Sequence, residues 1–570
     1  MINFLTYLLD NIFLIIPTTN QILGFFGLII FILSSNIIGS LITKKNNFNS
    51  NFFVGYSINY IFSLFLFSFK INVNYSFLSL VIVSLIVFYK KFYFYYEKIK
   101  SNFIQLKNKF ILFAPLAFIM ISSQAIGWDT FTHWLPLADG IKSLDNYPKF
   151  GHGQYYPFAS SLVLSNSSII LNDLSENVSA LFSIFLLVMF FQTLSCFYKD
   201  IFDIKKNNVF TFFLVLYVFY NPIHMNKFVY TAYCDFISAA VFFFLFFQMY
   251  QYFRKDNNLN IISLSLIASL LVGLKNTGLI LVLILFFTFF LYLVYKKKLN
   301  YFNLKSLIIF LSLPVLAFVY WQMILKFNNV LNSKFIQFSF FKEENMIFFQ
   351  NAFFQILSRP TFYIVSFFII FVFLFLGSVK KNKFKQIKDI SFLYIMFFFL
   401  WVSFVILTYI LHFDINVFYA NSFWRYCSQI SLVCSFVFLF YIIWFFKKFN
   451  LFNLKFLGTL FLVLILINPV IFSYKLRRDL EPLSLELRKL NKYQNQYKTI
   501  FLATKNNAYE TVKLNYYLQK PYTQNIVESV NIDNISLSEF EDKIKENKYQ
   551  LYIYLKKDIN NKIIKKIYFE

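Results

Sequence analysis

The sequence predicts an all-α protein that crosses a membrane many times and ends in a small α/β domain. Hydrophobic residues make up 58% of the 570-residue chain and charged residues only 14%, a balance that is not expected of a soluble protein of this length. Many windows of about 18–22 residues are almost free of charge, which is the length a helix needs to cross a hydrocarbon layer about 30 Å thick. Strands of a membrane β-barrel would alternate apolar and polar residues in runs of about ten, so a barrel is excluded.

The basic residues predict how these helices are oriented. They form short clusters between the apolar segments, at residues 44–45, 90–109, 199–206, 254–255, 296–298, 380–388 and 447–448. Placing every cluster in the cytoplasm predicts an inner N-terminus, an outer C-terminus and about 13–15 transmembrane helices. Membrane orientation therefore accounts for the net charge of +26, and we expect membrane lipids but no nucleic acid as partners.

The predicted spans follow from the same apolar windows. They lie at residues 2–17, 21–43, 110–126, 177–198, 209–222, 231–252, 305–326, 361–379, 390–412, 426–446 and 455–474. Residues 261–295 are expected to cross twice, with a tight turn near 273–278. The N-terminus lacks a basic stretch followed by a small-residue cleavage site, so no removable signal peptide is expected. The four cysteines show no CxxC pair and are interpreted as packing residues.

The composition of the chain changes after residue 474. Residues 497–504 and 549–556 read as strands, while 508–519 and 536–548 read as amphipathic helices, the second with Ser536 or Ser538 as its N-cap. This order predicts a small α/β domain outside the membrane at 475–570, following a transmembrane domain at 1–474. The domain shows no glycine-rich phosphate loop and no catalytic cluster.

Ionisable residues outside the basic clusters are predicted to collect on the outer side. An outer loop at about 127–176 opens with GWDTFTHWLPLADG (127–140), which places carboxylate, imidazole and indole groups directly after an apolar segment. Charged groups at membrane depth are costly, so each is a candidate for function. The candidates from this loop and from three later segments are Asp129, His133, Asp139, Asp235, Lys275, His412, Asp414 and Arg425.

Each candidate also has an ordinary structural explanation. Asp129 could cap the helix that follows it, and His133 could be an interfacial histidine. Asp139 fits a solvated loop, Lys275 could extend to the lipid headgroups, and Arg425 could anchor the end of a span. Asp235 is harder to explain in this way, because a long apolar run follows it without a nearby cation in sequence.

Four motifs together resemble the GT-C superfamily of membrane glycosyltransferases. The run WDTFTHWLPLA (128–138) followed by YYPFASSLVL (155–164) resembles the family's first outer loop. The closest likeness is to bacterial lipid-linked-sugar transferases related to protein O-mannosyltransferases and lipid A aminoarabinose transferase. The segments 230–247, 268–285 and 423–433 are similar to later family motifs and follow in the family's order. The resemblance covers about 125–435.

The resemblance implies transfer of a sugar from a polyprenyl-phosphate-linked donor, with inversion at the sugar. Asp129 is the expected general base, since a carboxylate beside the acceptor hydroxyl can take its proton. Lys275 and Arg425 are expected to bind the donor phosphate. The further substrate-binding residues expected are His133, Trp134, Asp139, Tyr155, Tyr156 and Asp235.

What we expect of a cofactor and of the donor rests partly on residue patterns that the sequence does not contain. Many relatives carry Asp-Glu where this chain has Asp129-Thr130, which argues against a divalent metal while leaving that alternative open. We expect no other cofactor. A nucleotide-sugar donor is not expected, because the chain has no Asp-x-Asp and no Rossmann-type glycine fingerprint.

The acceptor and the function class stay open at this level. The acceptor is a glycan, a lipid or a protein, and the expected site lies outside the bacterial cytoplasmic membrane. The alternatives are a lipid or polysaccharide transporter (flippase), an O-antigen polymerase or ligase, and a non-catalytic assembly protein. A transporter would predict internal repeats and charges near the membrane midplane, whereas here no repeat is obvious and the charges lie toward one face.

Overall fold

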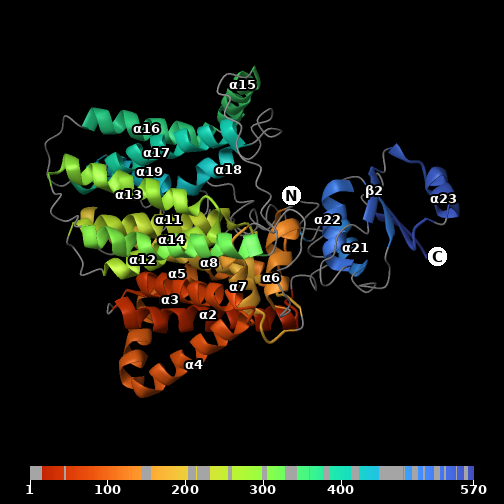
Figure 1. The fold of residues 1–570 in the computed structure, drawn as a ribbon, viewed down its shortest axis with the longest axis horizontal. Helices are drawn as coiled ribbons and strands as arrows, with labels where there is room; N and C mark the ends of the chain where they lie inside the picture. Colours follow the sequence, from red (N-terminus) through yellow and green to blue (C-terminus); the bar gives the residue numbers. More distant parts are fainter. Residues whose placement is uncertain are drawn as a thin grey trace.

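The structure is a computed structural model of the chain. It describes residues 16–43, 47–126, 129–142, 156–171, 173–202, 214, 218, 231–254, 260–297, 304–327, 343–358, 360–376, 385–412, 423–448, 479, 482–490, 499–504, 507–518, 527–531, 534–546, 548–557 and 563–569. Two parts are visible, a large bundle of helices and a small α/β unit beside one end of it (Figure 1).

Eight of the described helical stretches are long and apolar enough to cross a membrane. They are α2 (Thr19–Thr43), α3 (Phe48–Ser68), α8 (Val178–Phe202), α11 (Cys234–Phe253), α13 (Gly278–Tyr295), α14 (Leu304–Phe327), α17 (Lys385–His412), and the run of α18 (Phe423–Cys427), η5 (Ser428–Ile430) and α19 (Ser431–Lys448). Shorter apolar helices are α4 (Asn74–Lys90), the end of α5 (Phe92–Met120), α12 (Ile261–Leu274) and α16 (Pro360–Leu376).

The prediction of a mostly helical chain with many apolar helices is therefore confirmed, as expected of a multi-pass membrane protein. The number of 13–15 spans stays a prediction. The predicted spans at 2–17 and 455–474 lie outside the described residues, and so does most of the span at 209–222.

The first two described helices pack with their backbones in close contact. A Cβ atom added to Gly39 of α2 would lie 1.8 Å from the Asn51 carbonyl oxygen, and one added to Gly55 of α3 would lie 1.8 Å from that of Ser35. Small residues allow this approach, which is a common way for helices to associate in membranes. A larger side chain at either glycine would force α2 and α3 apart.

The predicted turn between the two halves of residues 261–295 is confirmed. Helix α12 ends at Leu274 and α13 begins at Gly278, so Lys275 lies in the intervening break. The 14 residues of α12 span about 21 Å at 1.5 Å per residue, which is shorter than a hydrocarbon layer of about 30 Å. The break therefore provides a polar loop between two apolar helices.

The elements of the outer loop lie at one end of the bundle. They are the π-helix η2 (Thr130–Trp134), α6 (Leu135–Lys142) and α7 (Ala159–Ser167). Helices α6 and α18 and the separate helix α15 (Glu343–Ser358) lie toward this same end, which is also the end that faces the α/β unit (Figure 1). Segments from distant parts of the sequence thus meet beside the C-terminal unit.

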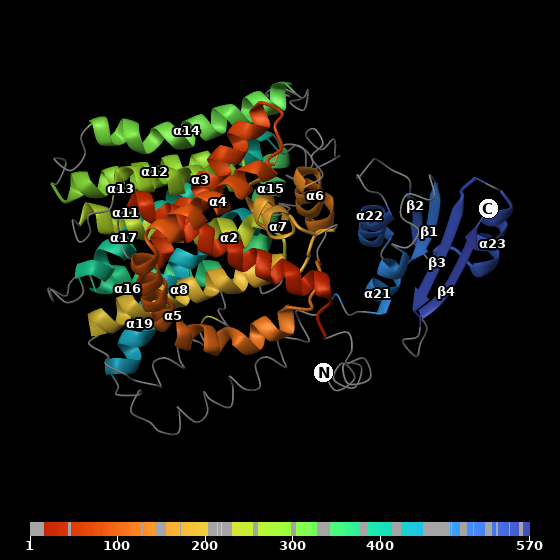
Figure 2. The same ribbon diagram turned by 90° about the horizontal axis from the view of Figure 1, so that it is seen from below.

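The C-terminal unit has three layers. Strands β1 (Ile500–Thr504), β2 (Val527–Asn531), β3 (Leu551–Lys557) and β4 (Ile563–Phe569) form a sheet in the order β2-β1-β3-β4, with only β4 antiparallel to its neighbour. Helices α21 (Pro482–Lys489) and α22 (Asn507–Leu518) lie between the sheet and the bundle, while α23 (Leu537–Lys545) covers the far face (Figure 2).

Alternation along the strands explains these layers, because successive side chains point to opposite faces of a sheet. Ile500 and Leu502 of β1 pack with Leu487 of α21 and Leu514 of α22. Phe501 of β1 packs on the other face with Phe540 of α23. Both predicted strands and both predicted helices are confirmed, and Ser536 is the N-cap in a complete capping box with Glu539. Helix α21 and strands β2 and β4 were not located from the sequence.

Candidate functional site

Four ionisable residues from separate segments form one ion-paired cluster at the end of the bundle that faces the C-terminal unit. Arg425 Nη2 lies 2.7 Å from Asp129 Oδ2 and 2.6 Å from Asp235 Oδ2, and Arg425 Nε donates to the same Asp235 oxygen at 3.1 Å. The Lys275 ammonium donates to the other carboxylate oxygen of Asp235. We call Asp129, Asp235, Lys275 and Arg425 the tetrad.

The local fold around Asp129 depends on a proline. Pro136 has no backbone N–H, so it cannot continue the normal hydrogen-bond ladder of an α-helix. The preceding turn widens into η2, in which the Leu135 N–H donates to the Thr130 carbonyl, and such π-turns are frequent at functional sites. Asp129 precedes η2, but among the described residues its carboxylate accepts no capping hydrogen bond from this helix. Its backbone N–H instead donates to the Tyr233 hydroxyl at 3.2 Å.

Asp235 is the central and most deeply buried acid of the tetrad. It lies in the first turn of α11, where a negative charge is favoured by the helix dipole, and its side chain is only 5% exposed. Its two carboxylate oxygens bind different cations, Oδ1 binding Lys275 and Oδ2 binding Arg425. The counter-ions of Asp235 thus come from distant segments, Lys275 from the break between α12 and α13 and Arg425 from α18.

The two cations are held by aromatic faces as well as by carboxylates. Lys275 Nζ lies 4.8 Å from the centre of the Tyr426 ring, and the Arg425 guanidinium lies 4.9 Å from that of Tyr233. Cation–π attraction strengthens where water is excluded. Two acids balance two bases, so the tetrad carries no net charge, which lowers the cost of burying four ionised groups.

The tetrad opens onto a polar cavity of about 170 Å³. Three of its members line this cavity, and the remaining lining residues are aromatic or imidazole side chains. The complete lining is Asp129, His133, Trp134, Tyr156, Lys275, Arg425 and Tyr426. Three acid and base groups from three separate segments are therefore accessible to a ligand in one space.

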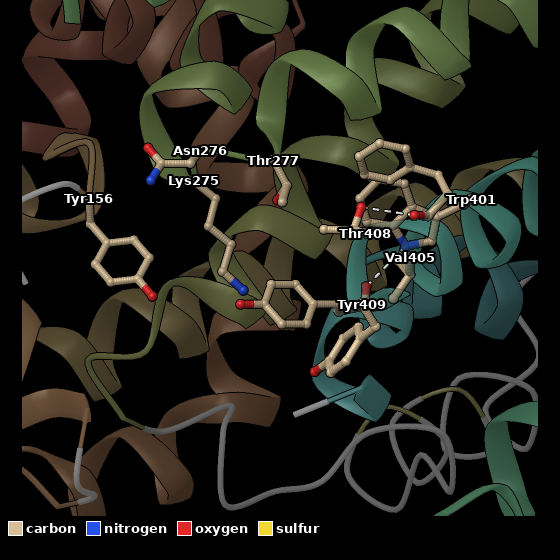
Figure 3. Close-up of a pocket in the computed structure, with 10 residues that line it drawn as sticks. Tyr156, Lys275, Asn276, Thr277, Trp401, Val405, Thr408 and Tyr409 are labelled. Atoms are coloured by element: carbon tan, nitrogen blue, oxygen red, sulfur yellow. Dashed lines mark hydrogen bonds between the residues drawn. The ribbon is translucent and has the colours of Figure 1, made fainter. Parts of the chain in front are cut away.

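A second cavity, of about 260 Å³, adjoins the first, and its walls are mainly apolar. The two cavities share Tyr156, Lys275 and Tyr426. Figure 3 shows Tyr156 and Lys275 on one side of this space and side chains of α17 on the other. The α17 residues that line it are Trp401, Phe404, Val405, Thr408 and Tyr409. Lys275 thus lies where the polar cavity meets the apolar cavity.

The other predicted site residues have different positions. His133 and Trp134 line the polar cavity, and their rings lie 5.1 and 5.4 Å from the Tyr156 ring. Asp139 does not line either cavity. Burial raises the pKa of Tyr516 in α22, and the negative charge of Asp139 raises it further. Tyr155, Asp414 and the side chain of His412 lie outside the described residues.

Several residues that line the cavities or contact the tetrad were not found from the sequence. Tyr426 follows Arg425 directly and Tyr233 lies just before Asp235, so their closeness to a charged candidate was the available signal. Trp401 and Thr408 had no such signal, because they lie within the long apolar helix α17. Among the residues that the structure describes, no group of three or more His, Cys, Asp or Glu side chains could hold a metal ion.

Comparison of the chain with protein-family models, curated proteins and solved structures found no match. The resemblance to the GT-C superfamily therefore rests on the four quoted motifs. Each motif contributes a residue to the tetrad: Asp129, Asp235, Lys275 and Arg425 come from the first, second, third and fourth motifs respectively.

Proposed function

We propose that the protein is a GT-C-like membrane glycosyltransferase that moves a sugar from a polyprenyl-phosphate-linked donor to an acceptor hydroxyl outside the bacterial cytoplasmic membrane. One observation carries this function. Asp129, Lys275 and Arg425 line a polar cavity that adjoins an apolar one. A lipid-linked sugar phosphate has the same division into a polar head and an apolar chain.

Asp129 is suited to act as the general base. Its carboxylate lines the polar cavity and can take the proton of an acceptor hydroxyl as the oxygen attacks the sugar. Catalysis of this kind typically contributes about 10²–10⁴-fold. Arg425 holds Asp129 at 2.7 Å, which fixes the position of the carboxylate. A direct attack by the acceptor inverts the configuration at the sugar carbon.

Lys275 is suited to bind the phosphate that leaves. An ammonium group has three N–H donors, and one is used by Asp235, so others can reach a ligand in the cavities. The N-terminus of α13 follows at Gly278, and helix N-termini favour phosphate groups. Beside it, Thr277 Oγ1 has no hydrogen-bond partner among the described residues, and its hydroxyl can donate to an anion. Lys275 in the shared wall and Thr277 in the wall of the apolar cavity make this region suitable for an anion.

The second candidate is a transporter or flippase for the same class of lipid. The pairing of Asp129 with Arg425 favours this alternative, because an acid held by a cation can serve a binding site without abstracting a proton. The two functions differ in whether a glycosidic bond forms. A transfer assay therefore separates them, provided that donor binding is measured beside it.

The test is transfer of labelled sugar from polyprenyl-phosphate donors in membranes that contain Asp129→Asn. The amide keeps the shape of the side chain but cannot act as the base, so we expect transfer to fall about 10²–10⁴-fold with donor binding retained. Asp542→Asn is the matched control, because Asp542 pairs with Lys545 on exposed α23. Full transfer by Asp129→Asn would remove Asp129 from the base role, and donor binding without any transfer by the unmodified protein would favour the transporter.

A further inference from the structure

A second partly buried arginine, Arg488, joins the C-terminal unit to the segment that carries Asp129. Arg488 of α21 contacts the Glu176 carboxylate through Nη2 at 3.2 Å and donates from Nε to the Tyr517 hydroxyl at 2.8 Å. The same Nη2 lies 3.4 Å from the Ala125 carbonyl oxygen. Glu176 in turn accepts from the Ala125 N–H at 2.8 Å. Both polar groups of the Ala125 backbone are therefore held by this network.

The neighbouring residue is held by the same part of the chain. The Gln124 N–H donates to the Asp479 carboxylate at 3.2 Å, and the Asp479 carbonyl lies 3.4 Å from Arg488 Nη1. Burial alone would lower the pKa of Arg488, but Tyr517, Glu176 and Asp479 outweigh that effect and raise it. Arg488 therefore remains charged, and a buried charge of this kind is costly to leave without its partner.

A second contact lies on the other side of Asp129. Phe131 of η2 is fully buried, and its ring centre lies 5.7 Å from that of Tyr516 and 5.9 Å from that of Tyr517, both on α22. Lys513 of the same helix places its ammonium 5.6 Å from the Phe131 ring. Aromatic pairs at these distances add to the free energy of burial. The π-turn after Asp129 is thus packed against the C-terminal unit.

The two contacts lie on either side of Asp129 in the sequence. Arg488 and Asp479 hold the backbone just before it, and α22 holds Phe131 just after it. Tyr517 takes part in both contacts, since its hydroxyl binds Arg488 and its ring packs on Phe131. We propose that the C-terminal unit positions Asp129 in the site, with Arg488 as the principal positioning residue. Since Asp129 is the proposed base, this role rests on the proposed function.

The alternative is that these contacts only attach the C-terminal unit to the bundle. A purely structural contact and a positioning contact differ in where the disturbance appears when it is broken. Loss of attachment would loosen the C-terminal unit. Loss of positioning would loosen residues 124–142 and would lower kcat more than it raises the KM for the donor, because Asp129 lies in this segment whereas Lys275 does not.

The experiment is hydrogen–deuterium exchange on the purified full-length protein, with and without Arg488→Gln. We expect the amides of 124–142 to exchange at least about tenfold faster in the variant, because local opening governs exchange, with α11 unchanged. Lys489→Gln is the matched control. Lys489 follows Arg488 in the same helix, is 65% exposed and pairs with Glu486 at 2.6 Å, so its replacement should leave 124–142 unchanged.

A second variant keeps the test decisive if Arg488→Gln fails to fold. Tyr517→Phe removes one hydroxyl and keeps the ring against Phe131, so we expect a smaller increase in exchange in the same peptides. Faster exchange confined to α21 and the sheet, or no change in 124–142 in either variant, would overturn the positioning role. Exchange is read without substrate, so this result is independent of whether Asp129→Asn retains transfer. Where transfer is measured, Arg488→Gln should lower kcat more than it raises KM.

Discussion

Two partly buried arginines bind carboxylates at the same end of the molecule but serve different surroundings. Arg425 joins Asp129 and Asp235 within the bundle and lines a cavity of about 170 Å³. Arg488 joins Glu176 to the C-terminal unit, and its other bonds go to a tyrosine hydroxyl and two backbone carbonyls. The Arg425 side chain is 20% exposed and that of Arg488 is 11% exposed.

The difference shows that the chemistry of an ion pair does not by itself indicate a functional site. Both arginines use the same planar group and similar partners. Arg488 Nε, Nη1 and Nη2 are all directed at acceptors within the protein, which suits a contact that holds two parts together. Arg425 lies at a wall where a ligand can approach, which suits a site. The polar cavity beside Arg425 therefore distinguishes a candidate functional site from a structural contact.

Removing the central acid of each network should give the largest difference in stability between the two arginine sites. Asp235→Ala leaves Lys275 without its carboxylate and Arg425 with only Asp129, and disrupting a buried pair typically costs about 3–5 kcal/mol. Glu176→Ala leaves only one cation, Arg488, without its carboxylate, and the hydrogen bond of Arg488 to Tyr517 remains. We therefore expect Asp235→Ala to lower the thermal unfolding midpoint in detergent more than Glu176→Ala does. An equal or smaller loss for Asp235→Ala would show that the tetrad is not the more strongly coupled network.

Filling the apolar cavity beside Arg425 should have an intermediate effect, which we expect on donor binding. Thr408→Phe places a ring in a space that Lys275 and Trp401 also line. If the cavity holds the prenyl chain, each displaced methylene group costs about 0.8 kcal/mol of binding, so the KM for long-chain donors should rise at least about tenfold.

The matched control for the cavity variant is Leu407→Phe. Leu407 is the neighbour of Thr408 on α17 and its side chain is 40% exposed, so added volume there meets the surroundings of the bundle instead of the cavity. Kinetics with donors of different chain length provide the measurement. An unchanged KM for long donors in Thr408→Phe would exclude this cavity as the chain site.

The smallest expected effect concerns an ion pair that lines neither cavity. Glu486 of α21 accepts from Lys489 at 2.6 Å and from Lys565 at 3.0 Å. Burial alone would raise the pKa of Glu486, but these bonds lower it below 4.5. A lowered pKa stabilises the folded state at neutral pH, and this contribution is lost as pH falls below about 4.5 through the folded-state value.

The difference in thermal midpoint between the unmodified protein and Glu486→Gln is the measurement for this ion pair. Exposed pairs contribute about 0.2–1 kcal/mol, so the difference should be small at pH 7 and should shrink as the pH is lowered toward 4. A difference that grows on acidification would contradict the assigned direction of the pKa shift.

Much of the fold could be predicted from local sequence patterns. Apolar runs indicated seven of the eight long helices, all except α3. The break at Lys275 was visible because Asn276, Thr277 and Gly278 interrupt an apolar stretch. Alternating strands and the Ser536 capping box were equally local signals. Strand β4 was missed because its charged centre, Lys565 and Lys566, hides the alternation that its apolar ends would show.

The four residues of the tetrad could be chosen from the sequence, but their pairing could not. Charges in apolar surroundings are conspicuous because burying them is costly, and this placed all four members of the tetrad among the eight ionisable candidates. Arg425 and Asp235 are 190 residues apart, and Arg488 and Glu176 are 312 apart. Which acid meets which base depends on how the helices are arranged, and local periodicity carries no such information.

The sequence by itself determined which segments are apolar helices, where the polar break lies and which charges required partners, since hydropathy and burial cost are properties of individual residues and short windows. Only the tertiary structure decided that Asp235 serves two cations, that an apolar cavity meets a polar one at Lys275, and that Arg488 holds the backbone beside Asp129. These are contacts between distant segments, and packing of the whole chain sets them.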